Sequence, residues 1–262
     1  MANYISGMPV WAIVLFIAGF LYSIAFIANP ARQAALNAGM TLKRSRNIQL
    51  SIWGFYIVYF AYVSILSLKG VFYVNSLPPK IFVLATLPLA IILFGIIGNT
   101  GLFKQLLRSV TLESLIALHI FRILGLFFIL LYFYHLLPAK FAFSAEMGDI
   151  ITAILALPVA KMVAKGRPGS IKVAYAWNIF GMLDIINVLT IAVIAARRSA
   201  ISGVSGGLEE MTIFPFVWFP AFAPATILFL HTVVFRKLQQ MKTTRDREQA
   251  LDFSASADRV HS

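Results

Sequence analysis

The chain has 262 residues, of which 60% are hydrophobic, only 12% are charged and none is cysteine. A mean hydropathy of +0.85 lies outside the usual range of soluble globular domains. The lack of cysteine excludes disulfide bonds, thiolate metal sites, iron–sulfur clusters and cysteine catalysis.

Apolar runs of about 20 residues recur along the chain, and each is long enough to cross a hydrocarbon layer as a helix. Their side chains do not alternate between apolar and polar, as those of a membrane β-barrel would. Seven such runs are present: residues 8–28, 50–68, 81–98, 115–137, 147–163, 173–196 and 211–235. The sequence therefore predicts an all-α membrane protein with one seven-helix domain over residues 1–241. The polar residues 242–262 are predicted to form a disordered cytoplasmic tail.

The basic residues are distributed unevenly between the two sides of these segments. Sixteen lie in the loops after the first, third and fifth segments and in the tail, whereas five lie on the other side, with Arg122 inside the fourth segment left out. Cytoplasmic loops carry the excess of Lys and Arg. This pattern predicts an amino terminus outside the cell and a cytoplasmic carboxyl terminus.

The net charge of +12 has the same explanation, and it also predicts attraction to anionic lipids at the cytoplasmic face. It does not indicate nucleic-acid binding, because the basic residues are spread over four segments without a recognisable binding module. Short loops and a compact chain suggest the inner (plasma) membrane of a bacterium. The oligomeric state is left open by the sequence.

Two opposite charges lie near the middle of predicted spans, Arg122 in the fourth and Asp184 in the sixth. A charge at the bilayer midplane costs roughly 2.5–3.5 kcal/mol on insertion scales, so it usually faces a partner or a wet cavity. Because the two residues lie at matching depth, we expect them to form a buried pair inside the bundle.

Other polar residues fall at similar depths. His119 lies one turn from Arg122 on the same face by the i, i+3 rule, and the inner half of the seventh span contains His231. The sequence thus predicts a polar site between the fourth, sixth and seventh helices. Its predicted ligand-binding residues are His119, Arg122, Trp177, Asn178, Asp184 and His231.

Several functions fit such a site. In the first, a small molecule or ion binds there in a transporter-like or sensor-like protein. Arg122 would then hold an anionic group or keep Asp184 ionised, and His119 would relay a proton. In another, the polar residues only hold the bundle together through interhelical hydrogen bonds, as in a structural or assembly subunit of a membrane complex.

A third alternative is a haem b electron-transfer protein, in which His119 and His231 ligate the iron from opposite sides. The two histidines come from different spans, and their estimated depths differ by about 7 Å on the helical rise. Helix bending at Pro215, Pro220 and Pro224 would have to reconcile these depths. No other metal site is predicted, because carboxylates do not cluster with the histidines in the sequence.

A second group of residues is predicted near the outer surface. Glu146 and Asp149 open the fifth segment, where the helix dipole favours acids, and His135 ends the fourth. We expect these three residues to form an outer mouth of the same cavity.

Catalytic motifs are missing from the sequence. The glycine- and serine-rich stretch 203–206 lacks the strand–turn–helix context of a nucleophile elbow. There is no His-Glu-x-x-His motif, phosphate-binding loop or dinucleotide fingerprint. The sequence therefore names no catalytic residue and favours a protein that is not an enzyme.

Overall fold

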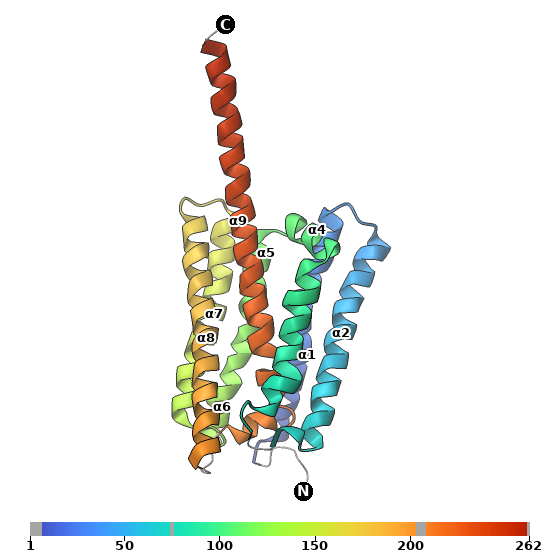
Figure 1. Cartoon of the computed structure of the whole chain (residues 1–262), viewed down its shortest axis with the longest axis vertical. Helices are drawn as coiled ribbons and strands as arrows, with labels where there is room; N and C mark the ends of the chain where they lie inside the picture. The colour runs from blue at the N-terminus through green and yellow to red at the C-terminus, as the bar shows by residue number, and fades with distance from the viewer. Residues whose placement is uncertain (1–6, 74–75, 203–207, 261–262) are drawn as a thin grey trace.

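The computed structural model describes residues 7–73, 76–202 and 208–260, and within these ranges the chain is helical with no strand. Seven helices pack side by side into a bundle, and α1 begins at the end opposite to where α9 finishes (Figure 1). All seven are long and apolar enough to cross a membrane: Val10–Asn37, Leu42–Leu68, Phe82–Asn99, Leu112–Phe133, Ala139–Ala164, Ser170–Ile201 and Trp218–Thr244. The predicted helical class is thus confirmed, and so are seven apolar helices of membrane-crossing length, with shifted boundaries.

The first two helices are longer than their apolar segments. Helix α1 covers Val10–Asn37 and α2 covers Leu42–Leu68, so only four residues separate them. The side chain of Thr41 accepts a hydrogen bond from the backbone N–H of Arg44 and caps α2. A helix does not end where its apolar stretch ends, which is why a hydropathy window underestimates both elements.

The third span is irregular. After the short 3₁₀ helix η1 (Val71–Tyr73), it consists of η2 (Phe82–Thr86), α3 (Leu87–Ala90), η3 (Ile91–Ile96) and η4 (Ile97–Asn99). Elements η2 and η3 are π-helical. Pro88 has no N–H for the carbonyl of Leu84, and the hydroxyl of Tyr62 donates to that carbonyl instead at 3.0 Å. The amphipathic helix α4 (Gly101–Ser109) follows.

The fourth span changes helix type in the middle. It is α-helical over α5 (Leu112–Ala117), 3₁₀-helical over η5 (Leu118–Gly125) and α-helical again over α6 (Leu126–Phe133). Runs of 3₁₀ helix this long are uncommon. The next two spans are the continuous helices α7 (Ala139–Ala164) and α8 (Ser170–Ser202).

The last span begins later than predicted. The short 3₁₀ helix η6 (Glu209–Thr212) and an irregular stretch precede α9, which covers Trp218–Val260. Pro220 is tolerated because it lies in the first turn of α9. Pro224, further inside, leaves the carbonyl of Pro220 without a helical donor, and the Thr86 hydroxyl donates to it at 2.7 Å.

Helix α9 is also longer than its apolar part. It continues to Val260, so residues 242–260 are helical in the structure although their composition predicts disorder. The stretch contains three Arg and three Ala, which have high helix propensity. In Figure 1 this part of α9 extends well beyond the other helices.

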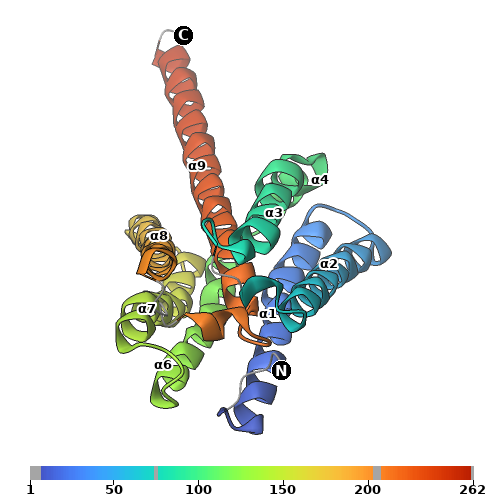
Figure 2. The same ribbon diagram turned by 60° about the horizontal axis from the view of Figure 1, so that its bottom comes forward.

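Helix α9 occupies the centre of the bundle. Figure 2 shows it between α1–α3 on one side and α6–α8 on the other, and most residues of its apolar part are buried. On the first side its contacts are aromatic: Phe60 stacks on Trp218, with ring centroids 4.8 Å apart, and Phe20 packs against Phe222. On the second side, polar residues meet.

Candidate functional site

The polar site is built around Arg122, which η5 places in the middle of the bundle at 2% exposure. A 3₁₀ helix has three residues per turn, so side chains at i and i+3 lie directly above one another. His119, Arg122 and Gly125 therefore lie along one face of η5. The local helix type thus aligns the two polar side chains more strictly than an α-helix would.

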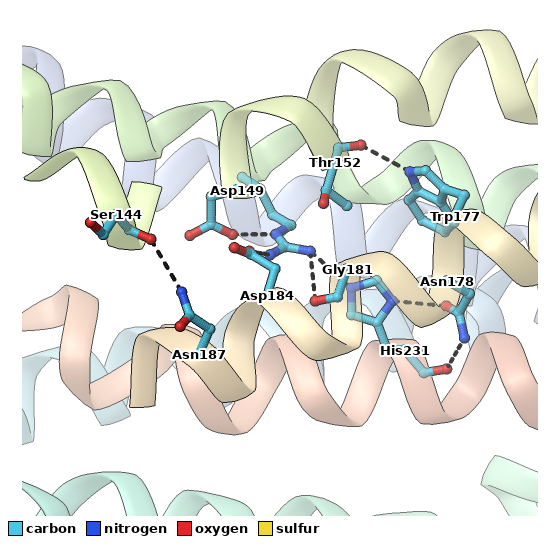
Figure 3. Close-up of polar contacts among 10 residues, drawn as sticks. Ser144, Asp149, Thr152, Trp177, Asn178, Gly181, Asp184, Asn187 and His231 are labelled. Carbon is cyan, nitrogen blue, oxygen red and sulfur yellow. Dashed lines mark hydrogen bonds and ion pairs between the residues drawn. The ribbon is translucent and has the colours of Figure 1, made fainter. Parts of the chain in front are cut away.

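The guanidinium of Arg122 is held by side chains from three other helices. Nε donates to Oδ1 of Asp149 on α7, and Nη2 donates to Oδ2 of Asp184 on α8 at 2.6 Å. Nη1 lies 2.9 Å from Nε2 of His231 on α9 and 3.4 Å from the carbonyl oxygen of Gly181. Four of the five guanidinium N–H donors are thus used within the protein. Figure 3 shows the two carboxylates, Gly181 and His231 around this centre.

The hydrogen bonds around His231 determine its tautomer. Nη1 of Arg122 is always a donor, so Nε2 of His231 must accept. Nδ1 therefore carries the proton and donates to Oδ1 of Asn178 at 2.8 Å, while Nδ2 of Asn178 donates to the backbone carbonyl of His231 at 3.1 Å. His231 is consequently neutral and is fixed in orientation by two helices.

Glycines make room for these charged groups where the helices meet. A Cβ atom added to Gly148 would overlap the carboxyl group of Asp184, and one added to Gly125 would overlap Oε2 of Glu146. At Gly181 an added Cβ would lie 2.6 Å from Nε2 of His231 and 2.9 Å from Nη1 of Arg122. Small residues let neighbouring helices approach closely, and here they also give space to polar side chains.

Glu146 and Asp149, which lie at this cluster, line a cavity of about 480 Å³. Its lining also includes residues 76–79, residues of η6 and the end of α8. Its walls are mostly apolar side chains from η2, α8 and α9. Glu146 is 1% exposed, and its Oε2 has no hydrogen-bond partner among the described residues.

His119 packs against His231. Its ring centroid is 4.2 Å from that of His231 and 5.1 Å from that of Trp177, and neither of its nitrogens has a hydrogen-bond partner among the described residues. Trp177 itself donates to the backbone carbonyl of Thr152 at 3.0 Å. Within the described chain, His119 is thus a fully buried imidazole held by ring contacts alone.

This arrangement corrects the haem alternative. Two imidazoles that ligate one haem iron lie on opposite faces of the porphyrin. The rings of His119 and His231 instead contact each other directly, which leaves no space for a macrocycle between them. Nε2 of His231 is also occupied by Arg122. The pair does not fit bis-histidine haem ligation.

The three residues expected at an outer mouth do not lie together in the structure. Helix α7 begins at Ala139, ten residues before Asp149, so Asp149 lies about 15 Å inside the helix. Glu146 and Asp149 consequently belong to the buried cluster. His135 is exposed at the end of α6 and borders a separate hollow with Tyr132 and Ala139. The structure does not bring His135 together with the two acids.

The predicted pair of Arg122 and Asp184 is present, and the structure brings His119, Trp177, Asn178 and His231 to the same region. Sequence reasoning missed Thr152, Gly125 and Gly148, and it expected Glu146 and Asp149 at an outer mouth with His135. The sequence did contain a pattern that could have indicated this grouping. Glu146, Asp149 and Thr152 are spaced at i, i+3 and i+6 and so share one face of the fifth segment.

Fold and site together define a helical bundle, compatible with a membrane protein, that has a buried ion cluster beside a cavity. Residues 77–239 match the model of a family described as a domain of unknown function, DUF8737. The match covers more than half of the chain, so the chain belongs to this family. It includes every residue of the cluster but not α1 and α2. Neither the curated proteins nor the solved structures contain a match.

Proposed function

We propose that this chain is a polytopic integral membrane protein that binds a small molecule in the cavity lined by Glu146 and Asp149, as a transporter or a sensor does. The observation that carries the proposal is the position of the buried ion cluster beside that cavity. Cavities of about 300–1,000 Å³ with mostly apolar walls and a few convergent polar groups are typical of small-molecule sites.

The direction of access follows from the proposed topology. With the amino terminus outside and the carboxyl terminus in the cytoplasm, the part of the cavity lined by η6 and the end of α8 faces the outside. The basic ends of the bundle then face the cytoplasm, where they attract anionic lipids. A reporter fused after Arg236 should score as cytoplasmic, and a periplasmic score would overturn this topology.

Binding can be tested by filling the cavity. Ala192 lines it from α8, whereas Ile194, two residues further along, is exposed on another face of the same helix. We expect the uncharged fluorophore N-phenyl-1-naphthylamine to bind the full chain in lipid nanodiscs with a saturable component. Ala192→Trp should weaken that component tenfold or more, and Ile194→Trp should leave it unchanged.

The outcome separates the proposed function from its main rival. If the wild-type chain and the Ala192→Trp variant show the same signal, the cavity is not a binding site. The cluster would then serve to hold the helices together, as in an assembly subunit of a membrane complex.

A further inference from the structure

We propose that the cavity takes an amphipathic molecule with a protonated amine, and that Glu146 accepts a hydrogen bond from its ammonium group. The inference rests on the proposed function, because it specifies the chemistry of a ligand in the same cavity. It assigns Glu146 a role that the ion pairs of Arg122 do not explain.

The first argument is the environment of Glu146. Its Oε2 lies against Gly125, is buried and has no hydrogen-bond partner among the described residues. Burying a carboxylate without a partner is costly, and such a group usually has a bound partner. Glu146 also lines the cavity, so its side chain borders the space that a ligand would occupy.

The second argument is the balance of charge. The carboxyl groups of Asp149 and Asp184 pair with Arg122, and they and Arg122 are also the charged neighbours of Glu146. Three carboxyl groups therefore face one guanidinium. A ligand ammonium group favours the ionised form of nearby carboxyl groups, whereas an anion opposes it.

The third argument is the lining of the cavity as a whole. Its charged residues are Glu146, Asp149 and Glu209, and no Lys, Arg or His is found among the described lining residues. Arg122 is not among the residues that line the cavity, and four of its five donors are already used within the protein. The cavity thus selects for positive charge.

The remaining walls determine the rest of the ligand. Aromatic and aliphatic side chains from η1, η2, α6, α7, α8 and α9 dominate the lining, including Phe72, Phe82, Phe128, Phe141, Ile185 and Phe219. An apolar body gains roughly 25 cal/mol for each Å² of surface that it buries against such walls. A compact hydrophobic group joined to an amine fits both parts of the cavity.

The test compares two fluorescent probes of similar shape. Dansylcadaverine carries an apolar dansyl group and a primary amine that is protonated at neutral pH, and its N-acetyl derivative has no charge. We expect the full chain in phosphatidylcholine nanodiscs to bind the amine at least about tenfold more tightly than the acetylated probe, as a charge-assisted hydrogen bond implies. Equal affinities would overturn the inference without any variant.

Variants then assign the preference to a residue. Glu146→Gln should remove most of the preference for the amine while retaining binding of the acetylated probe. Glu113→Gln, the same replacement at the start of α5 and outside the cavity lining, should retain the preference. A preference that survives Glu146→Gln would contradict the role of Glu146.

Two further measurements distinguish a failure of the proposed function from a failure of this inference and identify the source of the amine. If Ala192→Trp leaves the binding of both probes unchanged, the proposed function fails, whatever the preference between the probes. Adding phosphatidylethanolamine to the nanodiscs distinguishes the sources of the amine. Displacement of dansylcadaverine identifies a lipid headgroup as a competitor for Glu146, and unchanged binding points to a free amphipathic amine.

Discussion

Arg122 and Asp184 are joined by an ion pair in which Nη2 and Oδ2 are 2.6 Å apart, and Asp149 binds Nε of the same guanidinium. Arg122, Asp149 and Asp184 therefore form a triad that links η5, α7 and α8. Two carboxylates on one arginine mean that the loss of either acid leaves the arginine with a partner. Loss of the arginine leaves both acids without one.

This asymmetry predicts that replacing Arg122 destabilises the protein more than replacing either acid. Arg122→Met should destabilise the protein by roughly 3–5 kcal/mol, because uncompensated carboxyl groups remain buried. Asp184→Asn should cost less, since Arg122 keeps Asp149. The double variant should be less damaging than the sum of the single losses, but it should not recover wild-type stability because Asp149 then lacks its partner.

Melting temperature and the yield of purified protein in detergent would measure these effects. Arg108→Met is a suitable control, because Arg108 is exposed at the end of α4 and donates only to the carbonyl of Lys104. Strictly additive losses for Arg122→Met and Asp184→Asn would contradict a shared network.

The two central histidines should respond differently to the same replacement. His231→Leu removes the acceptor of Arg122 and the donor of Asn178, so two buried polar groups lose a partner. A cost of about 1–3 kcal/mol is expected for each such group. His119→Leu removes no hydrogen bond between described residues, because both of its nitrogens lack partners among them.

We therefore expect His231→Leu to lower the melting temperature clearly and His119→Leu to change it little. Each variant is the control for the other, as both residues are fully buried and their rings touch. A larger loss with His119→Leu would show that His119 has a polar partner, such as a bound water.

The glycines at the helix contacts give a third prediction. Gly148→Ala should disrupt the ion pair of Arg122 with Asp184, and Gly181→Ala should displace His231, because the added methyl groups would overlap those side chains. Overpacking of this kind typically costs about 1–3 kcal/mol. Thermal unfolding of the purified variants would measure it.

Gly54→Ala provides the matched control. Gly54 lies within α2, and an added Cβ would meet nothing within 4 Å. Since Ala has the higher helix propensity, this replacement should be neutral or slightly stabilising. If all three variants behave alike, the close approach at Gly148 and Gly181 does not matter for stability.

The number of spans and the pair of Arg122 with Asp184 could be predicted because both depend on depth along single helices. Long apolar runs give the spans, and a midplane charge needs a partner at the same depth. The position of Asp149 could not be predicted in this way. Its place in the cluster depends on α7 starting at Ala139, and residues 139–146 are too mixed in polarity for a hydropathy window to include them.

Other features depend on contacts between helices, which a single sequence does not specify. The glycine contacts at Gly125, Gly148 and Gly181 follow from how closely the helices approach. The same is true of the direct contact between the rings of His119 and His231, which leaves no space for a haem between them. The 3₁₀ geometry of η5 is likewise not visible in an apolar run that would also fit an α-helix.

The last prediction concerns the carbonyl group that Pro224 leaves without a helical donor. The hydroxyl of Thr86 donates to the carbonyl of Pro220 at 2.7 Å and so joins the π-helical part of the third span to α9. Thr86→Val keeps the shape of the side chain but leaves that carbonyl unsatisfied, which should cost about 1–3 kcal/mol. Because Thr86 and Pro220 both line the cavity, the variant should also weaken the binding of N-phenyl-1-naphthylamine.

Thr232→Val is the control, since the Thr232 hydroxyl donates to the carbonyl of Leu228 within α9 itself. Stability and probe binding measured on both variants would decide the matter, and equal effects of the two replacements would show that the bond between the helices adds nothing.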